Sequence, residues 1–229
     1  MDRYARQVTL IGADAQARIR GARVGVIGAG GLGSPALLYL AAAGVGSIVL
    51  IDDDQVATSN LHRQVIHSST SVGVDKATSA AQRLRDLNPE VEVATHVHRL
   101  TWDNALGTFA GCDVILDGSD NFDTRHIASH AAARLGVPHV WASILGFEAQ
   151  LSVFWAGRGP VYEDLFPAPP PPGSVPSCAQ AGAANAALFA AAMLASATSL
   201  TERLAARRHH PDHAHRHTIT ATAQDLRSE

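Results

Sequence analysis

The sequence predicts an α/β protein with a Rossmann-like, mostly parallel sheet and helices on both faces, continuing into a smaller C-terminal lobe. Short apolar runs alternate with helical patterns along most of the chain, an order typical of such sheets. A glycine-rich turn at 28–33 stands between an apolar run and a small-residue helix, which is the context of a dinucleotide-binding unit. Apolar residues make up 46% of the 229 residues, enough for a large core.

The individual elements follow from the period of the apolar residues and from the residues that stop each run. Asn88 and Pro89 stop one predicted helix, and Gly136 ends another. In the helix expected at 13–20, Ala17 and Ile19 are expected to face inward. In chain order, we expect a helix at 13–20, a strand at 23–27, a helix at 34–43, a strand at 47–52, a helix at 77–87, strands at 91–97 and 114–116, a helix at 122–135, strands at 137–142 and 150–155, a helix at 180–197 and an edge strand at 218–222.

The glycine turn predicts a nucleotide site. Gly28 lets the chain turn sharply, Gly30 lets backbone N–H groups approach a phosphate, and Gly33 lets the following helix pack close to the strand. The helix N-terminus offers free N–H groups and the positive end of its dipole to an anion. Asp52 follows Gly33 by 19 residues, where an acid can accept hydrogen bonds from ribose hydroxyls. The pattern does not say which nucleotide binds.

Composition divides the chain into three parts. Residues 1–160 are expected to form a nucleotide-binding Rossmann-like domain with an N-terminal arm, and residues 161–177 a proline-rich crossover loop with extended backbone. Residues 178–229 form an atypical, alanine-rich C-terminal lobe with a histidine-rich tail. Two histidines of that tail, His213 and His217, have a spacing that could hold a metal, but Pro211 opposes a regular helix, so a solvated tail is favoured.

Charge and hydropathy exclude several classes of protein. A net charge of −3 offers no basic surface for nucleic acid, and no apolar run reaches the roughly 18 residues of a membrane span. There is no charged-then-apolar leader after Met1, and two cysteines, Cys112 and Cys178, cannot form a disulfide framework. The cytoplasm is therefore the expected compartment.

Polar residues gather at the predicted carboxyl ends of the strands, where open parallel sheets bind ligands. Arg63 and Lys76 can neutralise a triphosphate, and Asp120 can hold a magnesium ion. Lys76 stands in the first turn of a helix, where a cation opposes the helix dipole by about a few tenths of a kcal/mol, which indicates a function for it. Hydride transfer needs no such groups, whereas nucleotidyl transfer does. The whole set is Asp52, Asp54, Asn60, Arg63, Gln64, Lys76, Asp120 and Asn121.

Six motifs in order resemble the ThiF/MoeB/HesA family, the bacterial relatives of ubiquitin-activating enzymes. They are RYARQ, GAGGLG, LIDDDQV, SNLHRQ, VGVDKA and DGSDN, and the resemblance runs from Arg3 to about Gly182. It implies that ATP adenylates the C-terminal glycine carboxylate of a ubiquitin-like sulfur-carrier protein that ends in Gly-Gly. It also implies a homodimer. Because no sulfurtransferase domain is appended, a separate protein would donate the sulfur.

The resemblance also implies roles for single residues. The glycine turn, including Gly31, would lie beside the nucleotide, and Lys76 would lie on the α-phosphate side. Arg6 would reach into the neighbouring subunit's site. Cys178 matches a loop cysteine that some members use to take the carrier as a thioester. The remaining implied contacts are Asp52 with ribose, Ser59, Asn60 and Arg63 with phosphate, Asp120 with magnesium, and Asp54, Gln64 and Asn121 with the nucleotide.

The sequence departs from the family at its zinc site. Most members carry two CxxC pairs that hold a structural zinc, but Val161 and Asp164 stand where the first pair is expected. No cysteine follows Cys178, so a tetrahedral thiolate site cannot form. We therefore expect ATP and magnesium, and no structural zinc.

Three alternatives stay open. The altered C-terminal lobe is compatible with adenylation of another carboxylate or amide, such as a peptide end in a biosynthetic pathway. The glycine turn alone is compatible with an NAD-dependent oxidoreductase. A non-catalytic scaffold is a further alternative, although every residue that the adenylation chemistry needs is present.

Overall fold

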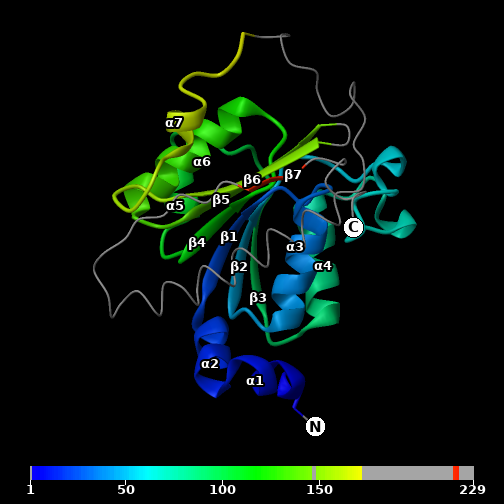
Figure 1. Ribbon diagram of the computed structural model, residues 1–229. Coiled ribbons are helices and arrows are strands. Elements are labelled where there is room, and N and C mark those ends of the chain that lie inside the picture. The colour runs from blue at the N-terminus through cyan, green and yellow to red at the C-terminus, as the bar shows by residue number, and fades with distance from the viewer. Residues whose placement is uncertain (1, 146–147, 172–218, 222–229) are drawn as a thin grey trace.

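A computed structural model describes residues 2–145, 148–171 and 219–221, and within these ranges the strands form one sheet (Figure 1). Their order across the sheet is β3-β2-β1-β4-β5-β6-β7, in which neighbours from β3 to β5 are parallel and β6 and β7 are antiparallel to their neighbours. The sheet is therefore mostly parallel, as predicted. The strands are β1 (Arg23–Ile27), β2 (Ser47–Ile51), β3 (Glu92–His96), β4 (Val114–Asp117), β5 (His139–Leu145), β6 (Glu148–Phe154) and β7 (Ile219–Ala221).

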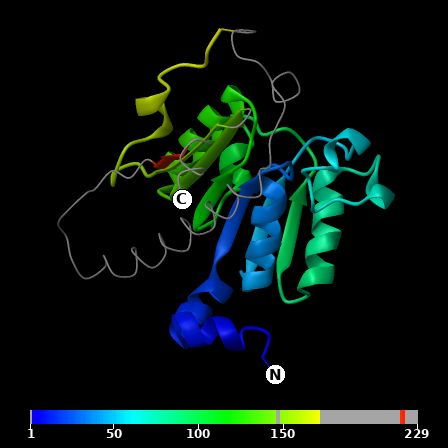
Figure 2. The same cartoon turned by 45° about the vertical axis from the view of Figure 1, so that its right-hand side comes forward.

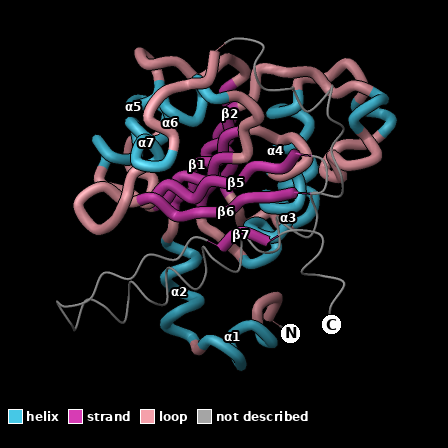
Figure 3. Tube along the Cα trace, turned by 45° about the horizontal axis from the view of Figure 1, so that its top comes forward, coloured by secondary structure: helices cyan, strands magenta, loops and turns pink. Residues whose placement is uncertain are grey.

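Helices cover both faces of this sheet, and Figures 2 and 3 show the strands between the two groups. Helices α3 and α4 cover one face, while α5, α6 and α7 cover the other. Short 3₁₀ turns at Thr58–Asn60 and Ser69–Ser71 lie between β2 and α4. The helices are α1 (Ala5–Ile11), α2 (Ala13–Gly21), α3 (Gly33–Ala43), α4 (Lys76–Leu87), α5 (Ala105–Thr108), α6 (Phe122–Leu135) and α7 (Tyr162–Leu165).

The central strands are apolar over most of their length because both of their faces are covered. Ile48 and Leu50 of β2 pack in the cluster under α3 and α4, whereas Val49 and Ile51 pack in the cluster under α5 and α6. In β1, a Cβ on Gly25 would lie 2.6 Å from the Phe109 ring, so this position has no room for a side chain. The core thus consists of two layers that share one sheet.

Two local expectations were wrong. In α2 the inward residue is Gln16 rather than Ala17, because this face meets a polar helix end, and the Gln16 Nε2 donates to the Ala43 carbonyl at 3.0 Å. The proline-rich segment does not begin extended, because it opens with α7, whose Tyr162 is fully buried against Trp141 and Phe154.

The remaining expected strands and helices before residue 155 occur with small shifts at their ends, and α1, α5 and α7 were not expected. The predicted edge strand is present as β7. The predicted helix at 180–197, Cys178 and the histidine-rich tail lie outside the described residues. In the described part, no helix is long and apolar enough to cross a membrane.

Candidate functional site: a cavity at the carboxyl ends of β1 and β4

A cavity opens where the strand order reverses, between the carboxyl ends of β1 and β4. Open parallel sheets bind ligands at this point, because the loops on its two sides diverge. Its walls come from the glycine turn, the segment after β2, the start of α4, the loop after β4, the start of α6 and the end of β5. The lining residues are Gly28, Gly30, Gly31, Leu32, Asp52, Asp54, Arg63, Gln64, Lys76, Gly118, Ser119, Asp120, Asn121, Thr124, Arg125 and Ile144.

The glycine turn needs its first and last glycines for different reasons. Gly28 has a φ of +88°, which side-chain-bearing residues rarely adopt. Gly33 begins α3 and lies behind the turn, where an added Cβ would lie 1.8 Å from the Gly28 carbonyl oxygen. The absence of a side chain at Gly33 is therefore what lets α3 start directly against the turn. The N-terminus of α3 consequently lies at the cavity, where its dipole favours an anion.

Ala29 is held on both sides of its backbone. Its N–H donates to Asp52 Oδ2 at 2.7 Å, and its carbonyl oxygen lies 3.0 Å from His67 Nε2 and 3.2 Å from Ser34 Oγ, which both act as donors. Because a carbonyl oxygen only accepts, the His67 proton sits on Nε2. Burial lowers the pKa of His67, which favours this neutral form.

Asp52 holds the backbone on both sides of the cavity floor. Its Oδ2 accepts from Ala29 and its Oδ1 accepts from the Asp54 N–H at 2.9 Å. Burial raises the pKa of Asp52, and the two backbone hydrogen bonds oppose that rise. Asp52 therefore shapes the turn in addition to lining the cavity, a role that sequence reasoning did not assign.

Lys76 is a buried cation in the cavity wall. Its side chain is 6% exposed, and its Nζ lies 2.6 Å from Oδ2 of Asp54, whose side chain is 70% exposed. The Lys76 N–H also donates to the Asp54 carbonyl at 2.9 Å, which fixes the start of α4 beside the segment after β2. The cation that opposes the α4 dipole is thus offset by an acid and faces the cavity.

Arg63 is half-buried and lines the same cavity. Its Nη2 donates to Asn60 Oδ1 at 3.1 Å, so Asn60 holds the guanidinium and does not itself line the cavity. Ser59 is exposed and is also absent from the lining. Gln64 is buried in the wall, and its Oε1 has no hydrogen-bond partner among the described residues.

The loop after β4 forms the other wall. Asp120 is exposed, and Asn121 caps α6 by accepting from the Thr124 N–H at 2.9 Å. Below the loop, Asp117 Oδ1 accepts from the Ser119 N–H at 2.9 Å. Within the described residues, no group of three or more His, Cys, Asp or Glu side chains could hold a metal ion. Asp120 is the carboxylate that this loop contributes to the cavity, in addition to Asp52 and Asp54 on the other side.

Asp117 forms a buried pair with His139 across β4 and β5. His139 Nε2 lies 3.1 Å from Asp117 Oδ2, and the two side chains are 1% and 0% exposed. Burial alone would raise the pKa of Asp117, but hydrogen bonds from His139 and Ser119 bring it below its ordinary value. The ionised carboxylate therefore persists under the loop and fixes its first residues.

Sequence reasoning missed part of this wall, namely Leu32, Gly118, Ser119, Thr124, Arg125 and Ile144. Arg125 carried a usable signal, because it stands near the start of the predicted helix at 122–135, where a cation opposes the dipole just as Lys76 does in α4. Leu32, Gly118 and Ser119 stand inside two of the quoted motifs but were not singled out, and Thr124 and Ile144 carried no signal, because their positions depend on how α6 and β5 come together.

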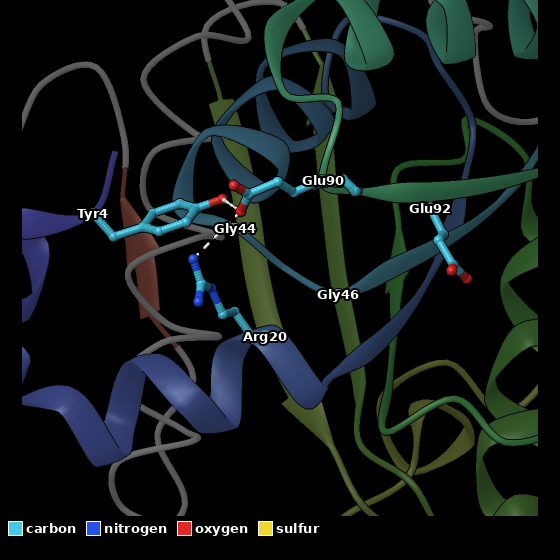
Figure 4. Close-up of a pocket in the computed structure, with 7 residues that line it drawn as sticks. Tyr4, Arg20, Gly44, Gly46, Glu90 and Glu92 are labelled. Carbon is cyan, nitrogen blue, oxygen red and sulfur yellow. Dashed lines mark hydrogen bonds and ion pairs between the residues drawn. The ribbon is translucent and has the colours of Figure 1, made fainter. Parts of the chain in front are cut away.

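Arg6 does not line this cavity. It is exposed on α1, and α1 lies beyond the amino ends of the strands, away from the glycine turn (Figure 1). Tyr4 anchors this arm: its ring packs on Gly44, and its hydroxyl lies 3.1 Å from Glu90 Oε2 and 2.8 Å from Asn88 Nδ2. Figure 4 shows Tyr4 and Glu90 pointing toward one another at a second pocket, while Glu92 points away.

Comparison with known proteins gives a consistent result. A model of the ThiF family matches residues 4–226. The probable adenylyltransferase/sulfurtransferase MoeZ of Mycobacterium tuberculosis is 53% identical over 186 residues, covering 79% of this chain and 47% of MoeZ. A sulfur carrier protein adenylyltransferase of Thermus thermophilus is 48% identical over 189 residues, covering 80% of this chain and 70% of that protein. The SAMP-activating enzyme E1 of Haloferax volcanii is 46% identical over 184 residues, covering 80% of this chain and 68% of that protein. The chain thus spans about half the length of MoeZ.

Solved structures share the fold at lower sequence identity. The crystal structure of PaaA gives a TM-score of 0.77 at 22% identity, covering 97% of this chain and 70% of PaaA. The crystal structure of Escherichia coli MccB with MccA-N7isoASN gives a TM-score of 0.77 at 19% identity, covering 97% of this chain and 72% of MccB. At these identities the likeness concerns the fold alone.

Proposed function

Because the chain belongs to the ThiF family, we propose that it is an adenylyltransferase that transfers AMP from ATP to the C-terminal glycine carboxylate of a ubiquitin-like sulfur-carrier protein. The name of the Thermus thermophilus relative, a sulfur carrier protein adenylyltransferase, supports this class of acceptor. The observation that carries the proposal is the cavity itself, because the glycine turn, Arg63 and Lys76 line one space although they come from three separate segments.

The reaction needs no general base. An oxygen of the acceptor carboxylate forms a bond to the α-phosphorus of ATP, the bond from this phosphorus to the oxygen that bridges to the β-phosphorus breaks, and pyrophosphate leaves. The carboxylate is already ionised near pH 7. The protein must hold it in line and stabilise the charge that grows on the phosphate oxygens. We assign that task to the N–H groups of the glycine turn, to Arg63 and to Lys76.

The ion pair between Lys76 and Asp54 fits this task. Asp54 is mostly exposed, so its carboxylate can turn into water when a phosphate approaches, whereas Lys76 is enclosed and stays in the wall. A phosphate would then take the place of the Asp54 carboxylate beside the Lys76 ammonium group, so the buried cation keeps a counter-charge throughout.

Magnesium fits the wall formed by the loop after β4. Mg²⁺ in such sites is held by one or two carboxylates together with substrate phosphates, and Asp120 supplies an accessible carboxylate there. When bound, the ion would neutralise charge on the phosphates. A structural zinc does not fit the first expected position, because Asp164 Oδ2 accepts from the Val161 N–H at 2.9 Å and caps α7.

The finer parts of the proposal concern the assembly. We propose a cytoplasmic homodimer in which Arg6 of one chain acts in the site of the other, a carrier that ends in Gly-Gly, and a separate protein as sulfur donor. In this proposal residues 1–160 bind the nucleotide, residues 161–177 connect, and residues 178–229 help dock the carrier. The Cys178 thiolate would bond to the carbonyl carbon of the adenylated carrier to form a thioester, while the bond from this carbon to the AMP oxygen breaks and AMP leaves.

Pyrophosphate exchange tests the function. The protein should exchange labelled pyrophosphate into ATP in the presence of one carrier from a panel that ends in Gly-Gly, and the exchange should stop when the final glycine is removed. Arg63→Ala and Lys76→Ala should each lower the rate by about 100-fold or more, since each removes a charge from the transition state. Arg83→Ala, which removes an exposed cation from α4, should leave the rate unchanged.

Each competing function has its own outcome. Exchange that depends on an unrelated peptide end would identify a different acceptor. Tight binding of NADH without binding of ATP would favour an oxidoreductase, and binding of ATP without exchange for any acceptor would favour a scaffold. Exchange that is equally fast in the Arg63 and Lys76 variants would contradict the roles assigned to these residues.

A further inference from the structure

Arg125 is a second buried cation in the cavity, and it enters from the other face of the sheet. Its side chain belongs to α6, whereas Lys76 belongs to α4, and these helices cover opposite faces (Figure 1). Arg125 is 6% exposed and yet lines the cavity. The reaction proposed above uses the glycine turn, Arg63 and Lys76 for the nucleotide, and it leaves this guanidinium without a role.

Arg125 has no acidic partner in the part of the chain that the structure describes. Its Nη2 donates to two neutral oxygens, the Ser119 carbonyl at 3.1 Å and Ser143 Oγ at 3.0 Å. Its guanidinium carbon lies 5.0 Å from the centre of the Phe122 ring and 5.6 Å from that of Trp141. A buried cation without a counter-charge is unfavourable, so an anion is the expected missing partner.

Unpartnered donors of the same wall point to the same ligand. Among the described residues, Arg125 Nε and Ser119 Oγ are buried with no partner at hydrogen-bond geometry, although the Tyr162 hydroxyl lies near Arg125 and the Asp117 carboxylate near Ser119. The N-terminus of α6, a helix of 14 residues, is in this wall through Asn121 and Thr124. A guanidinium, a hydroxyl and a helix N-terminus together favour an anion.

We propose that Arg125, with Ser119 and the start of α6, binds the C-terminal carboxylate of the acceptor. This inference rests on the proposed function, which brings two anions to one cavity. The glycine turn, Arg63 and Lys76 take the triphosphate, so the cation on the other face is left for the carboxylate. The planar donors of a guanidinium match a carboxylate better than an ammonium does. Asp120 in this wall and the exposed Asp123 beside it oppose an incoming anion, so a cation is needed here.

The test measures how much the C-terminal charge of the acceptor contributes to its affinity, apart from its other contacts. The probe is a short synthetic peptide that ends in Gly-Gly, prepared once with a free carboxylate and once with a C-terminal amide. Binding is measured with the full chain and an ATP analogue that has a methylene group between the α- and β-phosphorus. Wild type should bind the carboxylate form about 10- to 100-fold more tightly than the amide, the range for a charge-assisted hydrogen bond. An absence of preference in wild type would overturn the proposal.

Variants then test whether Arg125 causes the preference for the carboxylate peptide over the amide. Arg125→Gln should bind both peptides alike while its affinity for the ATP analogue is unchanged, and Arg134→Gln, an exposed arginine of the same helix, should behave as wild type. Ser143→Ala removes one hydrogen bond of Arg125 and keeps its charge, so the preference should persist. A purely structural Arg125 would lower both peptide affinities equally and leave their ratio intact, which would refute the proposal.

A spectroscopic measurement covers the case in which Arg125→Gln does not fold. The Nε–H resonance of Arg125, assigned by its loss in Arg125→Lys, should shift in wild type when the carboxylate peptide is added and should stay in place with the amide. A resonance that ignores both peptides would count against the proposal. Failure here together with normal pyrophosphate exchange would remove the role of Arg125 and leave the adenylyltransferase function standing.

Discussion

Lys76 is the only lysine among the 229 residues, and the structure places it in the wall of the cavity. Its ammonium group is enclosed and is paired with Asp54 at 2.6 Å. Every other cation of the chain apart from the N-terminus and the histidines is an arginine. An ammonium group is a compact charge with three donors, and it can contact several phosphate oxygens at once. The single lysine therefore stands where the proposed chemistry needs a cation beside the phosphates.

A chemical label tests this position directly. Because arginine is inert to amine-reactive acylating reagents, such a reagent should modify only the N-terminal amine and Lys76, and ATP should protect Lys76 alone. Peptide mass spectrometry with and without ATP measures the effect. The ratio of modification at Lys76 to that at the N-terminus should fall in proportion to ATP occupancy, about tenfold at ten times the dissociation constant.

Lys76→Arg is the matched control for this experiment, since it should remove the protected signal and retain labelling of the N-terminus. Labelling of Lys76 that ATP leaves unaffected would show that the phosphates do not reach this side chain.

At the scale of elements, the pair formed by Asp117 and His139 joins β4 to β5 directly beneath the loop that carries Asp120. The two side chains are 0% and 1% exposed, and Asp117 also holds the Ser119 N–H. One ionised carboxylate thus links two strands and a loop. The arrangement explains why this loop has a defined shape although it contains two small residues, Gly118 and Ser119.

The pair makes the stability of the sheet depend on pH. Because the pKa of Asp117 is below its ordinary value of 3.8, the ionised group stabilises the folded state above that value, and this contribution is lost as the pH falls below it. Asp117→Asn should lower the free energy of unfolding at pH 7 by about 3–5 kcal/mol, the range for breaking one partner of a buried pair. The difference between wild type and variant should shrink below about pH 3.8.

Urea unfolding of both proteins across this range measures the difference. Asp103→Asn, at an exposed position, is the control and should match wild type throughout. A difference between Asp117→Asn and wild type that stays constant down to the acid transition would contradict the assignment of the charge to Asp117.

At the scale of the whole molecule, the sheet could be predicted from the sequence because each of its parts has a local signal. The glycine turn, the continuous apolar runs and the residues that stop the helices mark β1, α3, β2, α4 and α6 without reference to one another. The strands β6 and β7 were also predicted, but their antiparallel direction was not, because the pairing of β6 with β7 joins distant segments. The helix α7 was not predicted, because prolines flank it on both sides. In α2, Ile19 packs against the core as expected, whereas Ala17 is exposed and Gln16 is buried, because the Gln16 amide donates to the Ala43 carbonyl.

The residues of the cavity also fall into those that could be predicted from the sequence and those that could not. Its first wall follows from motifs that adjoin β1 and β2, so Asp52, Arg63 and Lys76 could be named from the sequence. In the opposite wall, Asp120 and Asn121 could also be named, but Arg125 and Ile144 required the packing of α6 against β5, which brings Arg125 to Ser143. Asn60, named as a phosphate contact, accepts from Arg63 and is not in the lining, and spacing along a chain does not show which of two neighbours faces a cavity.

The placement of α1 makes a prediction about the assembly. If Arg6 acts in the site of a second chain, a mixture of Arg6→Ala and Lys76→Ala proteins should regain pyrophosphate exchange, because the mixed dimer has one site with both residues. With random pairing about half of the dimers are mixed and each has one working site of two, so about a quarter of the wild-type rate is expected.

Co-expression followed by exchange assays measures this recovery, and each variant alone should be nearly inactive. If Arg6 served its own chain, no mixture would recover activity. If Arg6 had no role in the reaction, the Arg6→Ala protein alone would be active.

The backbone of Ala29, held by Asp52, His67 and Ser34 before any ligand arrives, has a consequence for the rate of binding. A turn whose peptide groups are already oriented loses little conformational entropy when a nucleotide binds. The binding free energy is therefore not reduced by the cost of ordering the loop. Association should then follow a single kinetic phase whose rate rises linearly with concentration, without the plateau of a slow closing step. The protein would select its nucleotide by shape complementarity to a preorganised site.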